Sequence, residues 1–153
     1  MDAAGLLACR VSLESVLSRV MKNAPHYRVV AAVIERNGTI LCAQRGAGRA
    51  LEGKWEFPGG KVEEGETFKD ALIRELEEEL SVRIVPGEPL MTVEHRYPDF
   101  SLTLHAYRAA IASGEPILGE HRDLRWLTPK ELSSLDWAEA DLPIVERLTT
   151  KGK

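Results

Sequence analysis

Apolar residues recur at roughly helical spacing near the start of the chain, over residues 6–21. Asn23 and Pro25 interrupt that pattern, and the spacing of the apolar residues changes immediately afterwards. We therefore divide the chain into an N-terminal helical extension over residues 1–24 and one compact domain over residues 25–153.

β-Branched and apolar residues dominate the next stretch, over residues 28–34 and again over residues 39–43. Between these two runs lies Asn37-Gly38, a pair that supplies the positive φ angles of a two-residue hairpin turn. The pattern predicts two antiparallel strands joined by a tight turn.

The rest of the chain alternates between strand-like and helix-like spacing. We predict a helix from Thr67 to Leu80, a short helix that begins at Thr128-Pro129, and a last helix from about Asp141 to Leu148. Strand-like runs occupy residues 82–85, 90–97, 102–111 and 124–127, and Pro86-Gly87 separates the first two. This order of elements predicts an α/β or α+β fold.

Composition restricts the classes of function. At 153 residues, with 44% hydrophobic and 29% charged residues, the chain has the size and balance of one globular domain. Its formal net charge of -4 argues against a large basic surface for nucleic-acid polymers. No apolar run approaches the roughly 20 residues that span a bilayer, and Cys9 and Cys42 lack the spacing of metal ligands. We expect a cytoplasmic protein, monomeric or weakly dimeric, that binds neither membranes nor nucleic-acid polymers.

Three glutamates on the predicted helix carry the first chemical signal. Glu75, Glu78 and Glu79 are spaced i, i+3 and i+4, so their side chains leave one face of a helix within about one turn. Crowded carboxylates raise one another's pKa values, and a hard divalent cation such as Mg²⁺ offsets that repulsion. The alternative interpretation is a solvated acidic face on which Arg74 pairs with Glu78.

The segment before this helix favours the cation. It contains the turn Pro58-Gly59-Gly60, the basic Lys61 and an acidic, glycine-containing loop over residues 63–66. Glycines in such a segment allow backbone atoms to approach a metal or a phosphate closely.

From Gly60 to Val82 the chain resembles the Nudix box. Glu66 follows Gly60 after five residues, and the run from Arg74 to Glu79 follows after seven more. Ser81 departs from the box, which usually has glycine there, and serine ends a helix at modest energetic cost. The similarity covers about residues 27–148 and is to the MutT branch and its cytidine-triphosphatase relatives. It implies the Nudix fold, in which a mixed β-sheet is sandwiched between α-helices and the box forms a loop–helix–loop.

The resemblance also implies roles for individual residues. Metal binding is expected from the Gly59 carbonyl, Glu75, Glu78, Glu79 and Glu120, with Mg²⁺ as the cofactor and Mn²⁺ as an alternative. Glu75 and Glu120 are both candidates for the general base, and Arg74 is expected to organise the box carboxylates. Substrate binding is expected from Arg45, Lys61, Phe57 and Asp141, although Phe57 also suits the core. The four histidines share no ligand spacing and are interpreted as surface or strand residues.

The implied reaction is the hydrolysis of a nucleoside triphosphate to a monophosphate and diphosphate. Asp141 stands where the MutT branch carries a base-reading asparagine and the cytidine-directed relatives carry aspartate; a helix cap is the structural alternative. The first expectation is sanitation of oxidised or modified nucleotides such as 8-oxo-dGTP, and the second is hydrolysis of CTP or a modified cytidine triphosphate. A nucleotide-sugar or ADP-ribose hydrolase and a non-catalytic base-recognition module are the remaining alternatives.

Overall fold

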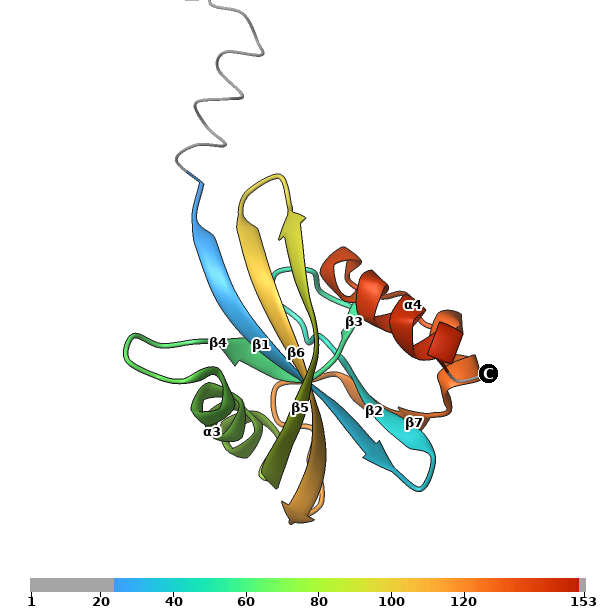
Figure 1. Ribbon diagram of the computed structural model, residues 1–153. Helices are drawn as coiled ribbons and strands as arrows, with labels where there is room; N and C mark the ends of the chain where they lie inside the picture. The colour runs from blue at the N-terminus through green and yellow to red at the C-terminus, as the bar shows by residue number, and fades with distance from the viewer. Residues whose placement is uncertain (1–23, 152–153) are drawn as a thin grey trace, which may run out of the picture.

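The computed structural model describes residues 24–151, whose arrangement is shown in Figure 1. The helix predicted over residues 6–21 lies outside the described residues. In chain order the elements are β1 (His26–Arg36), β2 (Thr39–Gln44), β3 (Trp55–Glu56), β4 (Gly59–Lys61), α3 (Phe68–Leu80), β5 (Arg83–Arg96), β6 (Ser101–Ser113), β7 (Asp123–Leu127), the 3-10 helices η1 (Pro129–Ser134) and η2 (Glu139–Asp141), and α4 (Leu142–Lys151).

Strand β1 connects the parts of a mixed, seven-stranded sheet. It pairs in parallel with β6 and antiparallel with β4, and its far end forms a hairpin with β2. The turn residues Asn37 and Gly38 have φ angles of 54° and 77°. The predicted hairpin and its turn are confirmed.

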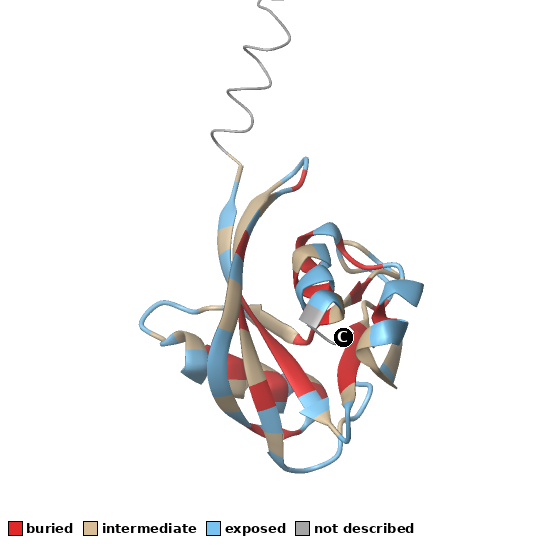
Figure 2. Ribbon diagram, turned by 45° about the vertical axis from the view of Figure 1, so that its right-hand side comes forward, coloured by how far each residue is buried: buried red, intermediate tan, exposed pale blue. Residues whose placement is uncertain are grey.

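Side chains of β1 alternate between two hydrophobic clusters, one on each face of the sheet. Val30 and Ile34 pack with residues of α3 such as Leu72, whereas Ala31 packs with Ile144 of α4. In Figure 1, α3 and α4 lie on opposite sides of the strands. Figure 2 shows the buried residues, in red, where strands and helices meet. The predicted sheet between helices is confirmed.

Helix α3 has a recognisable signal at each end. The Thr67 hydroxyl accepts a hydrogen bond from the Asp70 backbone N–H at 3.1 Å, as an N-cap does. Leu72 on the inner face is fully buried. At the other end Ser81 has φ 57° and ψ 35°, and its N–H donates to the Glu77 carbonyl at 3.1 Å. The chain therefore leaves the helix through a left-handed conformation that glycine adopts at no steric cost.

Two parts of the sheet differ from the sequence prediction. Residues 82–85 and 90–97 were predicted as separate strands, which is wrong: except for Val82 and Tyr97 they belong to the single strand β5, where Pro86-Gly87 accompanies a shift of register against β6. β5 lies at the edge of the sheet, where the missing N–H of a proline costs no interstrand hydrogen bond. Strands β3 and β4 had no predicted counterpart, because two or three residues are too few to show alternation.

The segment after β7 closes the second face of the sheet. The Glu131 carboxylate accepts a hydrogen bond from the Thr128 N–H at 2.9 Å, so the predicted helix start is confirmed, although the helix is of the 3-10 type. Helix α4 begins at Leu142 and buries Ile144 and Leu148. None of the helices in residues 24–151 has the length and apolar character that crossing a membrane requires.

Replacing Ser81 with glycine is expected to stabilise the protein by about 1 kcal/mol, because the left-handed conformation strains a residue that carries a Cβ atom. Urea unfolding followed by circular dichroism measures the free energy of unfolding. The matched control is Ser133→Gly, at an exposed position of η1, where glycine should lower the stability slightly. Equal changes at the two positions would contradict this explanation.

Candidate active site

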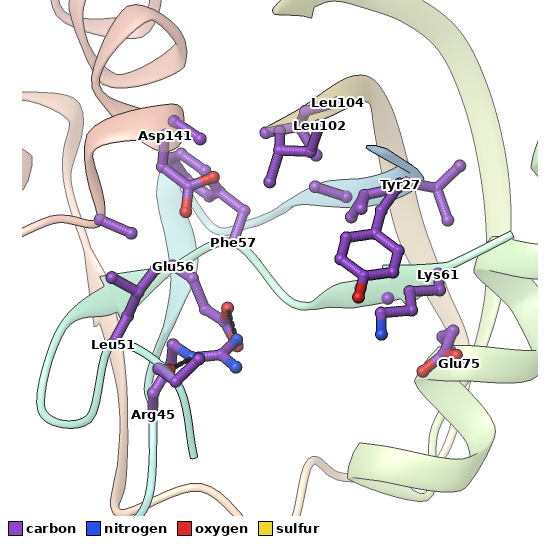
Figure 3. A pocket seen from close by; sticks show the side chains of 18 of the residues that line it. Tyr27, Arg45, Leu51, Glu56, Phe57, Lys61, Glu75, Leu102, Leu104 and Asp141 are labelled. Carbon is purple, nitrogen blue, oxygen red and sulfur yellow. Dashed lines mark hydrogen bonds and ion pairs between the residues drawn. The ribbon is translucent and has the colours of Figure 1, made fainter. Parts of the chain in front are cut away.

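A cavity of about 720 Å³ opens between the central sheet, helix α3 and the segment that leads into α4. Figure 3 shows that its wall has two chemically different ends. One end is apolar around Phe57, Leu102 and Leu104, with the Asp141 carboxyl group beside them. The charged side chains of the wall are those of Arg45, Arg49, Glu56, Lys61, Glu63, Glu75, Glu79 and Asp141. A flat ring fits the apolar end, and an anionic group fits the charged end together with a cation, because acidic side chains outnumber basic ones in the wall.

Two glycines allow strand β4 to lie close to its neighbours. A Cβ atom on Gly59 would lie 1.9 Å from the Val30 carbonyl oxygen of β1. A Cβ atom on Gly60 would lie 2.4 Å from the Glu75 carboxylate. The β4 backbone therefore lies directly against the sheet on one side and against a cavity carboxylate on the other.

Arg74 joins the loop before α3 to the helix itself. Its Nε and Nη2 atoms donate to the two oxygens of Glu66 at 2.8 and 2.9 Å, and its Nη1 atom donates to Glu75 at 2.9 Å. Nη2 also donates to the Lys61 carbonyl at 3.1 Å. The bidentate hydrogen bonds from Arg74 lower the pKa of Glu66 to about 2. Arg74 thus makes contacts of the organising kind that the sequence predicted.

Of the three glutamates predicted to bind metal on α3, two face the cavity. Glu75 and Glu79 line it, with side chains 13% and 17% exposed. The Glu78 side chain is 61% exposed, lies 3.3 Å from Arg74 and does not line the cavity. The structure brings Glu75 and Glu79 together and leaves Glu78 on the solvent side, where its metal-binding role stays a prediction.

Burial disfavours the charged forms of both cavity glutamates. It raises the pKa of Glu75 above the ordinary value. Burial also raises the pKa of Glu79 to about 7; the charge of His121 opposes this shift, and that of Glu56 adds to it. The Glu79 Oε2 atom is buried and has no hydrogen-bond partner among the described residues. A bound cation would stabilise the charged forms of the two glutamates and would give the Glu79 Oε2 atom a partner.

The atoms available near Glu79 suit a hard divalent cation. They are oxygens of the Glu75 and Glu79 carboxylates, and the backbone of Gly59 also lines the cavity. Within residues 24–151, no three His, Cys, Asp or Glu side chains are already gathered in metal-binding geometry. The residues therefore fit a cation that completes its coordination with water or substrate oxygens, as Mg²⁺ commonly does.

The sequence prediction missed two residues of this region: Glu56, which lines the cavity, and His121, which contacts Glu56 without lining the cavity itself. The Glu56 carboxylate accepts a hydrogen bond from Arg45 Nη1 at 2.6 Å and lies 3.1 Å from His121 Nε2. The interpretation of His121 as a surface or strand residue is wrong, because its side chain is 0% exposed and it lies on a loop. The position of Glu56 between two aromatic residues, Trp55 and Phe57, could have marked it as a site residue in the sequence. No sequence pattern marks His121.

The other predicted site residues divide between the cavity and the surface. Lys61 lines the cavity, and its Nζ lies 3.9 Å from the centre of the Tyr27 ring. Arg49, which was not predicted, also lines the cavity and lies 3.7 Å from Glu79. Glu120 is exposed and does not line it. The structure thus does not bring the Glu120 side chain to the α3 glutamates, and its catalytic and metal-binding roles stay predictions.

Asp141 and Phe57 form part of the apolar end. Phe57 is 2% exposed and stacks on Trp137 with ring centres 4.6 Å apart, so it belongs to the core and also lines the cavity. Asp141 is 5% exposed, and burial raises the pKa of its carboxyl well above the usual range, although the Phe57 N–H is its hydrogen-bond partner. A buried carboxyl that keeps its proton both donates and accepts a hydrogen bond.

Hydrogen bonds to the segment before α4 hold Asp141 in place. The Trp55 N–H donates to the Asp136 carbonyl at 2.8 Å. The Tyr97 hydroxyl accepts from the Ala140 N–H at 2.9 Å. The next residue, Asp141, is therefore fixed at the cavity wall between β3 and the end of β5.

A family model identifies this arrangement: residues 29–147 match the model of the NUDIX domain. The chain belongs to the Nudix family. The predicted resemblance, the Nudix fold and the enzymatic class are thereby confirmed, and the protein is a hydrolase of phosphoric anhydrides. Nudix hydrolases use divalent metal ions, which agrees with the carboxylates of the cavity.

Named relatives and a solved structure cover most of the chain. The CTP pyrophosphohydrolase of Escherichia coli (strain K12) is 42% identical over 118 residues, which are 77% of this chain and 87% of that protein. The 8-oxo-dGTP diphosphatase of the same strain is 31% identical over 119 residues, 78% of this chain and 92% of that protein. The solution NMR structure of the DNA mismatch repair protein MutT from methicillin-resistant Staphylococcus aureus 252 is 42% identical, with a TM-score of 0.68, and the match covers 84% of this chain and 98% of that one.

The two glycines of β4 are expected to respond differently to alanine. Gly59→Ala should lower the free energy of unfolding by about 2 kcal/mol or more, because its Cβ meets rigid backbone of β1. Gly60→Ala should cost less than about 1 kcal/mol, because the Glu75 side chain can turn away, but hydrolysis should fall at least about tenfold. Urea unfolding and a diphosphate-release assay on both variants measure this. A Gly60→Ala variant with full activity would contradict the position given to Glu75.

Asp141→Asn is expected to stabilise the protein at neutral pH. Because burial raises the pKa of Asp141 in the folded state, the folded protein retains a proton that the unfolded chain releases above a pKa of roughly 3.9. Stability is therefore lost as the pH rises from that value through the folded pKa, and asparagine removes the loss.

Thermal unfolding at about pH 4 and about pH 8 should show a larger advantage of Asp141→Asn at the higher pH. The matched control is Asp99→Asn, at an exposed position, where no such difference is expected. An advantage that does not change with pH would contradict the raised pKa of Asp141.

Proposed function

We propose that this chain hydrolyses nucleoside triphosphates to a nucleoside monophosphate and diphosphate, with a divalent cation. The division of the cavity carries the proposal: a buried carboxyl at an apolar end suits a nucleobase, and two carboxylates at the other end suit metal-bound phosphates. The relatives named CTP pyrophosphohydrolase and 8-oxo-dGTP diphosphatase support the same class of substrate. In this proposal residues 25–153 form the catalytic domain and residues 1–24 an extension.

Mg²⁺ is the proposed metal, with Mn²⁺ as an alternative, and the residues that would hold it are Gly59, Glu75, Glu78 and Glu79. When bound, the cation supplies neutralisation of phosphate charge and activation of the attacking water. Glu75 is the proposed general base, since it lines the cavity and burial raises its pKa, whereas the other candidate, Glu120, is exposed.

Basic side chains orient the phosphates in this proposal. Arg45 and Lys61 lie on different parts of the cavity wall, as Figure 3 shows, and are proposed to contact phosphate oxygens. Arg74 does not line the cavity but donates to Glu75, so we propose it as a positioning residue. Together with the cation, these charges reverse the sign that the buried carboxylates would otherwise give the site.

Asp141 is the proposed reader of the base. A protonated carboxyl offers one donor beside one acceptor, and it complements a base edge that does the same. 8-Oxoguanine carries N7–H beside the O6 acceptor, whereas unmodified guanine carries acceptors at both atoms. Cytosine offers its N4 amine beside the N3 acceptor. We place 8-oxo-dGTP and related damaged nucleotides first; CTP or a modified cytidine triphosphate is the second candidate, favoured by the 42% identity to the E. coli CTP pyrophosphohydrolase.

Two further classes fit the cavity less well. A non-catalytic base-recognition module has no use for buried glutamates such as Glu75 and Glu79 at the end of the cavity away from the base. A nucleotide-sugar or ADP-ribose hydrolase releases two monophosphate-bearing fragments, so its products differ. The formal charge of -4 disfavours a nucleic-acid polymer as substrate. We propose a monomer or a weak homodimer.

The substrate class is tested by steady-state hydrolysis of 8-oxo-dGTP, dGTP, CTP, 5-methyl-dCTP and ADP-ribose with Mg²⁺. We expect diphosphate and a monophosphate as products, and a preference for 8-oxo-dGTP over dGTP of about tenfold or more in kcat/KM. A preference for the cytidine nucleotides would instead assign Asp141 to cytosine recognition. Absence of metal-dependent turnover of every substrate would contradict the proposal.

Glu79→Gln is expected to lower kcat by about 100-fold or more, because an amide is a poor ligand for a hard cation. The same change should raise the thermal stability of the metal-free protein at neutral pH, since it removes a carboxylate that burial disfavours. The matched control is Glu77→Gln on the same helix, where the side chain is 48% exposed and pairs with Arg83. If both variants lose activity equally, Glu79 has no special role.

A further inference from the structure

His121 lies on the loop between β6 and β7, and its side chain is 0% exposed. Glycines permit close backbone contacts on both sides of this loop. A Cβ atom on Gly119 would lie 2.5 Å from the Glu79 carbonyl oxygen, and one on Gly46 would lie 2.2 Å from the Glu120 carbonyl oxygen. The backbone before His121 therefore packs against α3 and the segment after β2, and the Arg122 N–H after it donates to the Gln44 carbonyl at 2.9 Å. These contacts fix the imidazole beside the cavity.

The imidazole stands between two cavity carboxylates. Its Nε2 atom lies 3.1 Å from Glu56 Oε2 and 3.9 Å from Glu79 Oε2. The other oxygens of these carboxylates face arginines: Glu56 Oε1 accepts from Arg45 at 2.6 Å, and Glu79 Oε1 lies 3.7 Å from Arg49. Basic and acidic groups thus alternate along a single row, with His121 at its centre.

Three polar atoms of this row lack hydrogen-bond partners among the described residues. Glu79 Oε2, Arg49 Nη1 and His121 Nδ1 are buried with no hydrogen-bond partner among the described residues. Buried polar atoms without partners cost free energy, so their presence calls for an explanation. The unpaired Glu79 oxygen suits a cation that prefers oxygen ligands, such as the Mg²⁺ of the proposed function.

We propose that His121 is a positioning residue for the metal-binding end of the cavity. By donating from Nε2 to Glu56 it fixes its own ring, and the fixed ring holds the Glu79 carboxylate in the orientation in which it binds the cation. This inference rests on the proposed function, because the cation is part of it. Side chains that orient metal ligands without touching the metal commonly contribute roughly 10–100-fold to metal affinity.

The geometry requires a donor at the Nε2 position and not only a side chain of the right size. Two substitutions separate these requirements. Glutamine places an amide N–H near the position of Nε2, so His121→Gln keeps the donor. Methionine has a similar volume and no donor, so His121→Met removes it. His105→Met is the matched control, because His105 stacks on Phe68 and its side-chain hydrogen-bond partner is Thr92, not a cavity carboxylate.

Binding of Mn²⁺ to the full-length, nucleotide-free protein tests the proposal, by titration calorimetry and by the electron paramagnetic resonance of free Mn²⁺. We expect His121→Met to weaken Mn²⁺ binding by roughly 10–100-fold, and His121→Gln to remain within about threefold of the unmodified chain. His105→Met should bind as the unmodified chain does. Circular dichroism establishes that each variant is folded.

Unchanged Mn²⁺ affinity in folded His121→Met would overturn the proposal. So would an equal loss in His121→Gln and His121→Met, because the residue would then act through its shape alone. If His121→Met does not fold, His121→Asn takes its place, since its amide reaches the Nδ1 position and leaves the contact to Glu56 unmade. Mn²⁺ binding is measured without substrate, so a failure of the nucleotide assays would reject the proposed function and leave this result standing.

Discussion

Four of the carboxyl groups that line the cavity are largely buried, and burying them there costs free energy. They belong to Glu56, Glu75, Glu79 and Asp141. Two guanidinium groups and the Lys61 ammonium group in the same wall do not balance them fully, and the pKa of Glu79 is raised to about 7. The site is therefore arranged for a state in which further positive charge is present, and a divalent cation supplies that charge.

The surrounding structure keeps these carboxyl groups where they are. Strand β4 lies against β1 because position 59 is glycine, and its next residue, Gly60, leaves space for the Glu75 carboxylate. Arg74 then bonds that carboxylate and both oxygens of Glu66, which joins the loop to helix α3. The Nudix box is thus held as one rigid unit. Its glycines leave room for neighbouring backbone and for the Glu75 carboxylate, and Arg74 fixes the orientation of the Glu66 and Glu75 carboxylates.

Local signals in the sequence predicted the elements that depend on local backbone preference. The Asn37-Gly38 turn and the Thr67 N-cap belong to this group, and so do the α3 glutamates that share one helix face. Glu56 and His121 were not predicted, because they meet only when strand β3 and the loop before β7 are brought together in the folded chain. β5 was divided wrongly for a related reason: Pro86-Gly87 breaks a strand pattern in the sequence, but an edge of a sheet tolerates it.

The central claim is that the acidic end of the cavity binds the cation and the apolar end binds the base. Anomalous diffraction from crystals of the protein grown with Mn²⁺ and a nucleoside triphosphate analogue, in which carbon replaces the oxygen between the α- and β-phosphates, measures both positions at once. The account predicts an Mn²⁺ peak in direct contact with the Glu79 carboxylate, with the edge of the base at Asp141. An Mn²⁺ peak away from helix α3, or a base bound outside the cavity, would contradict it.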